Sequence, residues 1–327
     1  MNPPTGGDTI VSHDVERAAM NSTRSDPLIS VASDNECLVC GQSSWSTWHD
    51  ILLQCGTCGH LRAGFDVDEE TALSCYGSEY FHGGEYGDYL AEREVLRRNF
   101  ARRFEDIDRI TGGLDSVFEI GCAYGFWLEL SSSQDVRAAG VDVCLESVSY
   151  AREELGQDAV HGDFTDVAIS PGQYSAFVMW DTIEHLAHPE RFVARVAELL
   201  PSGGWLFLTT GDAGSRLALK RGPKWRMIHP PTHVHYFNRD TMERFLARHG
   251  LEVRDVYSAP IYRNMRGTLA NLQTLGRGWI RKTATAVAPL IPTALQDRIG
   301  LWINLGDIMF VAAQKTGGAT GTQKDAE

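Results

Sequence analysis

The sequence predicts an α/β fold, in which a doubly wound and mostly parallel sheet follows a small metal-binding unit. Residues 116–130 read SVFEIGCAYGFWLEL: a β-branched and aromatic run, a turn of small residues, and an apolar pattern at helical spacing. Further strands and helices alternate after this stretch, as expected for a parallel sheet covered by helices. Two C-x-x-C pairs precede it. These three observations define the expected architecture.

The composition is that of an ordinary globular protein. The 327 residues are 43% hydrophobic and 22% charged, enough for one full domain with small additions. The formal net charge of −13 argues against a nucleic-acid backbone as the main partner, because most of the surface would repel it. No apolar run is long enough for a membrane span, and the first twenty residues lack the hydrophobic core of a signal peptide. We therefore expect a cytoplasmic protein that acts on small molecules.

Changes of composition along the chain suggest its organisation. We expect a disordered arm (1–34), a zinc ribbon (35–65), a cap made of an aromatic loop and an amphipathic helix (66–112), a main domain (113–315) and a disordered tail (316–327). Residues 259–304 form a variable insertion within the main domain. In the cap, tyrosines 76, 80, 86 and 89 either cover a cofactor or simply pack on the domain.

Four of the seven cysteines predict a metal site. Two C-x-x-C knuckles, each followed by a glycine, place four thiolates where they can complete a tetrahedral zinc shell. The alternatives are a redox dithiol and plain buried cysteines, but a redox motif is normally single and leads into a helix. Four protein ligands leave no open position, so the zinc has a structural role, and His49 and His60 are bystanders. The ligands are Cys37, Cys40, Cys55 and Cys58.

The turn after the first strand of the main domain indicates a small-molecule cofactor. Its order is Glu119-x-Gly121-x-Ala123-x-Gly125, with the acidic residue inside the strand, which differs from the G-x-G-x-x-G of dinucleotide-binding proteins. Small residues let a ligand approach the main chain, and free N–H groups at the helix start suit an anionic group. The pattern resembles motif I of the class I S-adenosylmethionine (SAM)-dependent methyltransferases, with Ala123 in place of the middle glycine.

Later segments follow the order of the same family. Asp142 ends the second strand, Asp163 and Phe164 follow a short third strand, and D-T-I-E-H follows the fourth, ahead of a proline-started helix and a P-S-G-G turn. The resemblance implies a Rossmann-like sheet of seven strands with an antiparallel last strand. It also implies that Asp142 binds the ribose, and Asp163 and Phe164 the adenine, of SAM. The cofactor residues it implies are Glu119, Gly121, Cys122, Ala123, Gly125, Asp142, Val143, Asp163, Phe164, Trp180 and Asp181.

Histidines are the candidate catalytic groups. Methyl transfer to a hydroxyl requires alignment of the acceptor and removal of its proton, and His185, His233 and His235 are the residue type best suited to proton transfer near neutral pH. The D-x-x-E-H motif also resembles the metal-binding E-x-x-E-H group of the small-RNA 2′-O-methyltransferases. This implies an alternative site for Mg²⁺ or Mn²⁺, although Asp181 and Glu184 could instead line the cofactor pocket. Its ligands would be Asp181, Glu184, His185 and His233.

The resemblance implies a SAM-dependent methyltransferase that acts on a small molecule. The acceptor expected from the family subgroup is a hydroxyl of a sugar, glycolipid or secondary metabolite, methylated on oxygen. The alternatives are C-methylation of a nucleotide-activated ketosugar, a reaction for which zinc-ribbon enzymes are known, and a non-catalytic protein with the same fold. The cofactor motifs are intact, which speaks against the last of these.

Overall fold

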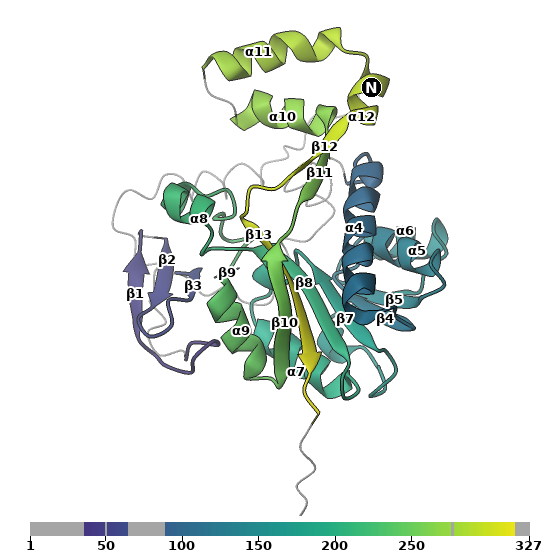
Figure 1. The fold of residues 1–327 in the computed structure, drawn as a ribbon, viewed down its shortest axis with the longest axis vertical. Helices are drawn as coiled ribbons and strands as arrows, with labels where there is room; N and C mark the ends of the chain where they lie inside the picture. The colour runs from purple at the N-terminus through teal and green to yellow at the C-terminus, as the bar shows by residue number, and fades with distance from the viewer. Residues whose placement is uncertain (1–35, 50, 65–88, 276–277, 318–327) are drawn as a thin grey trace, which may run out of the picture.

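The computed structural model describes residues 36–49, 51–64, 89–275 and 278–317. The predicted arm, most of the aromatic loop and most of the tail lie outside these ranges. A seven-stranded sheet forms the centre of the molecule, in the order β10-β13-β8-β7-β4-β5-β6 (Figure 1). The strands are β4 (Ser116–Ile120), β5 (Arg137–Asp142), β6 (Ala159–His161), β7 (Ala176–Trp180), β8 (Trp205–Gly211), β10 (Leu251–Ser258) and β13 (Ile308–Lys315).

The sheet has the predicted direction pattern. Strands β4 to β8 are parallel, whereas β13 runs antiparallel to both β8 and β10. Every residue of β4 and β7 is buried, as expected for strands covered on both faces. The expected fold class, a doubly wound Rossmann-like sheet of seven strands with an antiparallel last strand, is confirmed.

Helices cover both faces of this sheet. Successive side chains of β4 point to opposite faces of the sheet. Val117 packs on the face covered by α4 and α5, and Phe118 packs on the face covered by α7 and α9. The predicted amphipathic helix is α4, which contributes Phe104 and Ile107 to the first of these faces. The helices are α4 (Arg93–Thr111), α5 (Phe126–Ser132), α6 (Leu145–Glu153), α7 (Pro189–Leu199), α8 (Arg216–Arg221) and α9 (Arg239–Ala247).

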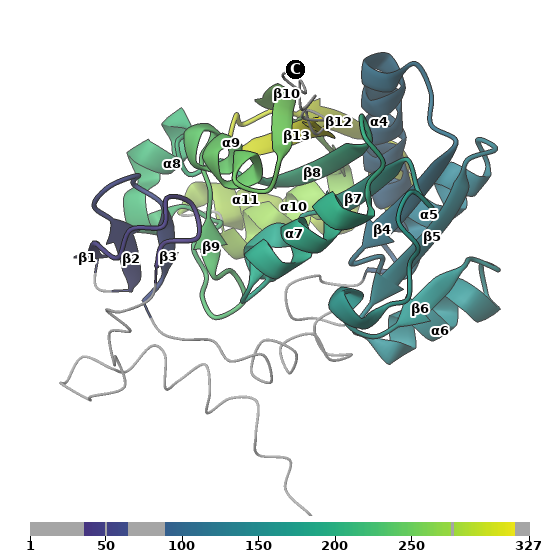
Figure 2. The same ribbon diagram turned by 90° about the horizontal axis from the view of Figure 1, so that it is seen from below.

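The cysteine-rich segment forms part of a second, four-stranded sheet. Strands β1 (Trp45–Trp48), β2 (Leu52–Cys55) and β3 (Leu61–Ala63) form an antiparallel meander, and β3 then pairs with β9 (His235–Tyr236). Figure 2 shows this sheet against the side of the main domain that carries α8 and α9. The segment predicted as a ribbon therefore shares a sheet with a strand that lies about 170 residues later in the chain.

The insertion projects from the main sheet. Strands β11 (Ile261–Asn264) and β12 (Gly300–Ile303) pair with each other and carry α10 (Met265–Leu275), α11 (Trp279–Val287) and α12 (Thr293–Arg298) at one end of the molecule (Figure 1). Short 3-10 helices occur at Phe164–Asp166, Ile183–His185, Gly222–Lys224 and Ala288–Leu290. Within the described ranges, no helix is both long enough and apolar enough to cross a bilayer.

Candidate active site

The turn between β4 and α5 has the backbone conformation that its small residues predict. Gly121, Ala123 and Gly125 all have positive φ, at 79°, 44° and 74°. A Cβ atom on Gly121 would lie 2.8 Å from Oγ1 of Thr182, so a side chain at this position is excluded by contact as well as by conformation. Ala123 takes the left-handed conformation despite its methyl group, and its departure from the family motif therefore preserves the shape of the turn.

Asp142, at the end of β5, holds this turn in place. Its Oδ2 accepts a 2.8 Å hydrogen bond from the N–H of Ala123, and its Oδ1 accepts one of 2.9 Å from the N–H of Cys144. Burial raises the pKa of the Asp142 carboxyl, and these backbone donors oppose that rise. Each carboxylate oxygen can accept a further hydrogen bond, which leaves capacity for a ribose hydroxyl.

Glu119 provides a test of whether the site fits SAM. The side chain is buried in β4, and its Oε2 has no hydrogen-bond partner among the described residues. Burial, together with the nearby charge of Asp142, raises the pKa of Glu119 well above its ordinary value. A buried acceptor without a donor is costly unless a ligand supplies one. The ammonium group of SAM is such a donor, so the residues at this turn fit the cofactor.

Asp163 and Phe164, the predicted adenine-binding residues, lie in different environments. The Oδ1 of Asp163 accepts hydrogen bonds from both the N–H and the hydroxyl of Thr165, each 2.6 Å long, at the start of a 3-10 turn. The ring of Phe164 instead packs in the core against Phe118 and Phe177. The predicted contact of Phe164 with the adenine of SAM stays a prediction.

Three more of these residues lie around the turn. Cys122 is buried within it, and the carbonyl of Val143 accepts a hydrogen bond from the imidazole of His161. Trp180 ends β7, where its ring packs on that of Trp127, and its buried Nε1 has no partner among the described residues.

A carboxylate and two imidazoles meet after β7. One ligand atom from each of Glu184, His185 and His233 lies within 4.8 Å of the other two. The Nδ1–H of His185 donates to the carbonyl of Thr232 (3.0 Å), and that of His233 donates to the carbonyl of Met227 (2.8 Å). In both rings Nε2 then carries the lone pair, an arrangement typical of metal-binding histidines.

The electrostatics of this cluster favour neutral imidazoles. Burial lowers the pKa of His185 to about 4, and burial together with His185 and His229 lowers that of His233 to about 2. Burial and the nearby Asp181 raise the pKa of Glu184 to about 8, and neither of its oxygens has a hydrogen-bond partner among the described residues. Asp181 itself is not among the residues whose ligand atoms meet.

His235 points away from this cluster. Its Nε2–H donates to the carbonyl of Ala187 (3.4 Å), so its Nδ1 accepts from Nε2–H of His60 (3.2 Å). His60, directly before β3, is fully buried and its ring stacks on that of His235, a position that its sequence context did not predict. His229, which no sequence motif singled out, also lies here, and its ring centroid is 3.8 Å from that of His233. The only sequence clue was that His229 shares one short segment with the other two histidines.

The four predicted zinc ligands come together. The Sγ atoms of Cys37 and Cys58 lie 3.6 Å apart, as do those of Cys40 and Cys55, and all four lie within 4.8 Å of one another. The glycine after each knuckle, Gly41 or Gly59, has positive φ. Four thiols at this spacing fit a tetrahedral zinc ion.

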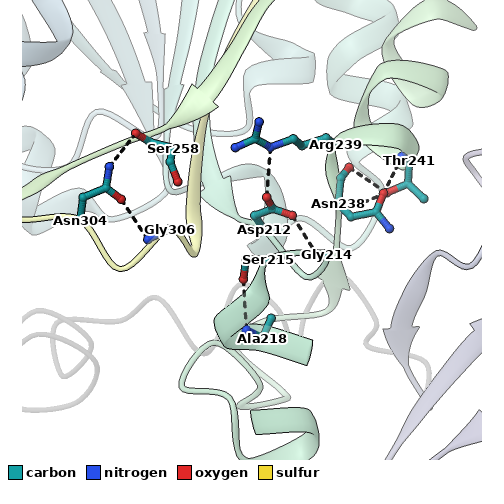
Figure 3. A network of polar contacts seen from close by, with 10 residues as sticks. All are labelled: Asp212, Gly214, Ser215, Ala218, Asn238, Arg239, Thr241, Ser258, Asn304 and Gly306. Carbon is teal, nitrogen blue, oxygen red and sulfur yellow. Dashed lines mark hydrogen bonds and ion pairs between the residues drawn. The ribbon is translucent and has the colours of Figure 1, made fainter. Parts of the chain in front are cut away.

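An open cavity of about 510 Å³, lined mainly by polar and charged residues, lies beyond the end of β8. Figure 3 shows its main contacts: Asp212 accepts hydrogen bonds from Arg239 and from the backbone of Gly214, and Asn238 caps α9. The backbone N–H of Asp212 also donates to the carbonyl of Asp307, whose carboxylate binds Arg226. The lining residues are Asp212, Gly214, Ser215, Arg216, Asn238, Arg239, Asp240, Leu305 and Gly306.

Comparison with known proteins identifies the family. Residues 86–256, just over half of the chain, match the family described as "Methyltransferase domain". Among curated relatives, a ubiquinone biosynthesis O-methyltransferase of Nitrosomonas europaea is 27% identical over 143 residues, covering 41% of this chain and 55% of that protein. The counterpart in Chromobacterium violaceum is 28% identical over 136 residues, covering 40% and 56%. The chain thus spans about half the length of these relatives.

A SAM-dependent methyltransferase from Archaeoglobus fulgidus is 17% identical and aligns with a TM-score of 0.47 over 69% of this chain and 99% of that one. The family match, the seven-stranded sheet and the glycine turn agree. The chain belongs to the methyltransferase-domain family, which uses SAM as its cofactor, and it has the class I fold.

Proposed function

We propose that this protein is a SAM-dependent methyltransferase that methylates a hydroxyl group of a small molecule. The observation that carries the proposal is the convergence of Glu184, His185 and His233. The first two belong to the 3-10 turn that directly follows Thr182, whose hydroxyl donates to the carbonyl of Ile120 at the glycine turn. SAM supplies an electrophilic methyl group on a sulfonium. The protein is then required to align the acceptor and to assist the loss of its proton.

We assign the cofactor side of the site to the turn and the neighbouring strand ends. Gly121, Ala123 and Gly125 keep the backbone open for close approach, and Asp142 and Asp163 offer carboxylate oxygens to the nucleoside. Glu119 offers its unpartnered oxygen to the ammonium group. We retain Cys122, Val143, Trp180 and Asp181 as residues that line the turn.

A divalent ion is a second candidate for the acceptor side. Imidazoles with pKa values of about 4 and about 2 are weak general bases at neutral pH. Neutral Nε2 atoms are good ligands for Mn²⁺, and the Glu184 carboxyl group would join them as a carboxylate when a cation displaced its proton. We propose that Glu184, His185 and His233 would hold such an ion, which would lower the pKa of the acceptor hydroxyl. The tetrathiol site is proposed to hold a structural zinc ion.

The cavity beyond β8 supports a polar acceptor. It adjoins the loop that carries Asp307, whose carboxylate binds the guanidinium of Arg226. Met227, which follows Arg226 in the chain, accepts a hydrogen bond from His233 through its carbonyl. Carboxylate, guanidinium and amide groups around the cavity suit hydroxyl groups. We therefore propose a sugar-bearing or other hydroxylated metabolite as the acceptor. The names of the curated relatives also support O-methylation.

The test is transfer of an isotopically labelled methyl group from SAM to a panel of acceptors. A mass increase of one methyl group, located on oxygen by NMR, is the expected result. If a nucleotide-activated ketosugar instead receives the methyl group on carbon, O-methylation is wrong and the alternative, C-methylation of such a sugar, is correct. No transfer to any acceptor by protein that binds SAM would favour a non-catalytic role.

Replacing Asp142 with Ala should weaken SAM binding. The variant loses the carboxylate that fixes Ala123 and is assigned to the ribose, and a charge-assisted hydrogen bond of this kind contributes about 1–3 kcal/mol. Isothermal titration calorimetry with SAM and S-adenosylhomocysteine measures the loss, with the exposed Glu153→Ala as the matched control. Unchanged affinity in a folded Asp142→Ala protein would contradict the assignment.

A further inference from the structure

Exposed apolar side chains gather on the projecting module, which we define as residues 261–305. Of the fourteen large apolar residues that are exposed in the described part of the chain, ten lie between residues 272 and 305. Leu290 and Trp279 are the most exposed, at 78% and 75%. Such a concentration on one projecting element indicates a binding surface, since isolated exposed apolar residues are normally scattered.

The module is anchored to the body by its base. The side chain of Asn99 on α4 exchanges two hydrogen bonds with the backbone of Tyr262 (2.7 and 3.2 Å), and the guanidinium of Arg98 lies over the Tyr262 ring. Within the module, α11 packs on α10 through the buried Ala284. Trp279 and Leu290 take no part in this anchoring and face outward.

The module also differs in charge from the rest of the chain. Residues 261–305 contain six Lys and Arg residues and one acidic residue, a net charge of +5, which leaves −18 for the remainder. Arg281 and Lys282 are exposed directly after Trp279 and Ile280 at the start of α11. Tryptophan and aliphatic side chains next to cationic ones are typical of helices that lie in the interface of an anionic bilayer.

The position of the module connects it to the active site. It leaves the main sheet after β10 and returns at β13, whose first residue, Ile308, pairs with Gly211 at the end of β8. The backbone N–H of Ala259 donates to the carbonyl of Ile308 and closes the base of the module. The module therefore rises from the edge of the sheet at which the glycine turn follows β4 and Glu184 and His185 follow β7. Figure 1 shows it projecting beyond the sheet.

We propose that the projecting module docks on the surface of an anionic lipid bilayer, with Trp279 and Leu290 inserted and Arg281 and Lys282 among the headgroups. The strongly acidic remainder is repelled by such a surface, which orients the module toward it. Pairing of two modules would instead bring like charges of +5 together. Resting on the proposed function, the docking also implies an amphipathic acceptor that is methylated at the bilayer interface.

The test is sedimentation of the full-length protein with lipid vesicles. We expect binding to vesicles made of phosphatidylcholine and phosphatidylglycerol in about equal parts, and much less binding to phosphatidylcholine alone. Raising the salt concentration from about 0.1 M to about 1 M should weaken the binding, because the screening length falls from about 10 Å to about 3 Å. Two double variants should each lose at least about nine tenths of the affinity for anionic vesicles. They are Trp279→Ser/Leu290→Ser, which removes the inserted side chains, and Arg281→Glu/Lys282→Glu, which reverses the charges.

Matched controls carry the same changes on other surfaces. Leu219→Ser replaces a residue that is 72% exposed on α8, and Arg152→Glu/Lys220→Glu repeats the charge change; both should bind as the unaltered protein does. The proposal is overturned if the protein ignores anionic vesicles, if the controls lose as much binding as the module variants, or if Trp279→Ser/Leu290→Ser abolishes self-association and leaves vesicle binding intact. Because vesicle binding requires no methyl transfer, it is independent of the proposed activity, which the acceptor panel tests separately.

Discussion

Replacing His233 or His185 with Ala is expected to lower turnover by about 10²–10⁴-fold while SAM affinity stays within about twofold. Each imidazole is anchored by a backbone carbonyl through Nδ1, and Nε2 carries its lone pair, so its removal deletes either a proton acceptor or a ligand. The glycine turn and Asp142 do not depend on these side chains for their hydrogen bonds. Single-turnover kinetics, with calorimetry of SAM binding, measures the two effects separately.

A second arm distinguishes the two chemical roles. His188→Ala, at an exposed position near the same loop, is the matched control and should retain turnover. If EDTA abolishes activity and Mg²⁺ or Mn²⁺ restores it, the cluster of Glu184, His185 and His233 is a metal site; if EDTA has no effect, a histidine acts as a base. Near-normal turnover of the double variant His185→Ala/His233→Ala would remove both from the mechanism and leave a reaction that relies on positioning alone.

Local patterns were sufficient to predict the central sheet. Runs such as Val117–Phe118 and the alternation of strands and helices specify a sheet that is buried on both faces, and this is the sheet observed. The four predicted ligand cysteines could be grouped for the same reason, because the spacing within each C-x-x-C knuckle is set locally. In these cases nearby residues determine the geometry.

The arrangement of the histidines could not be read in this way. His233 and His235 stand two residues apart, yet β9 directs one toward His185 and the other toward His60. Strand β9 has only two residues, too few to show an alternating pattern in the sequence, and its partner β3 lies far away in the chain. The packing of the Phe164 ring against Phe118 and Phe177, which belong to other strands, was likewise not readable from its neighbours in the sequence.

The ribbon and the histidine cluster are joined by a short chain of backbone hydrogen bonds. The N–H of Ala63 on β3 donates to the carbonyl of Val234 (2.8 Å), and the N–H of Val234 donates to the carbonyl of Glu184 (2.9 Å). His60 and His235 add a buried side-chain bond beside them. The ribbon therefore contributes to the position of His233 relative to Glu184 and His185.

Loss of the ribbon metal is accordingly expected to reach the active site. Elemental analysis should find about one zinc per chain, and Cys55→Ser should remove it and disorder the ribbon, because binding of structural zinc contributes about 10–16 kcal/mol to folding in small zinc domains. The main sheet, which has its own core, should stay folded and bind SAM. Turnover should fall by about tenfold or more, since a misplacement of about 1 Å can cost two orders of magnitude.

Cys75→Ser, which alters a cysteine outside both C-x-x-C pairs, is the matched control and should keep its zinc and its activity. Circular dichroism and SAM calorimetry on Cys55→Ser separate a local loss from global unfolding. Zinc-free protein with four freely titratable thiols and full turnover would refute both the metal site and its coupling to His233. Loss of turnover with SAM affinity intact would instead place the effect on the acceptor side, where β3, β9 and Glu184 are linked through Val234.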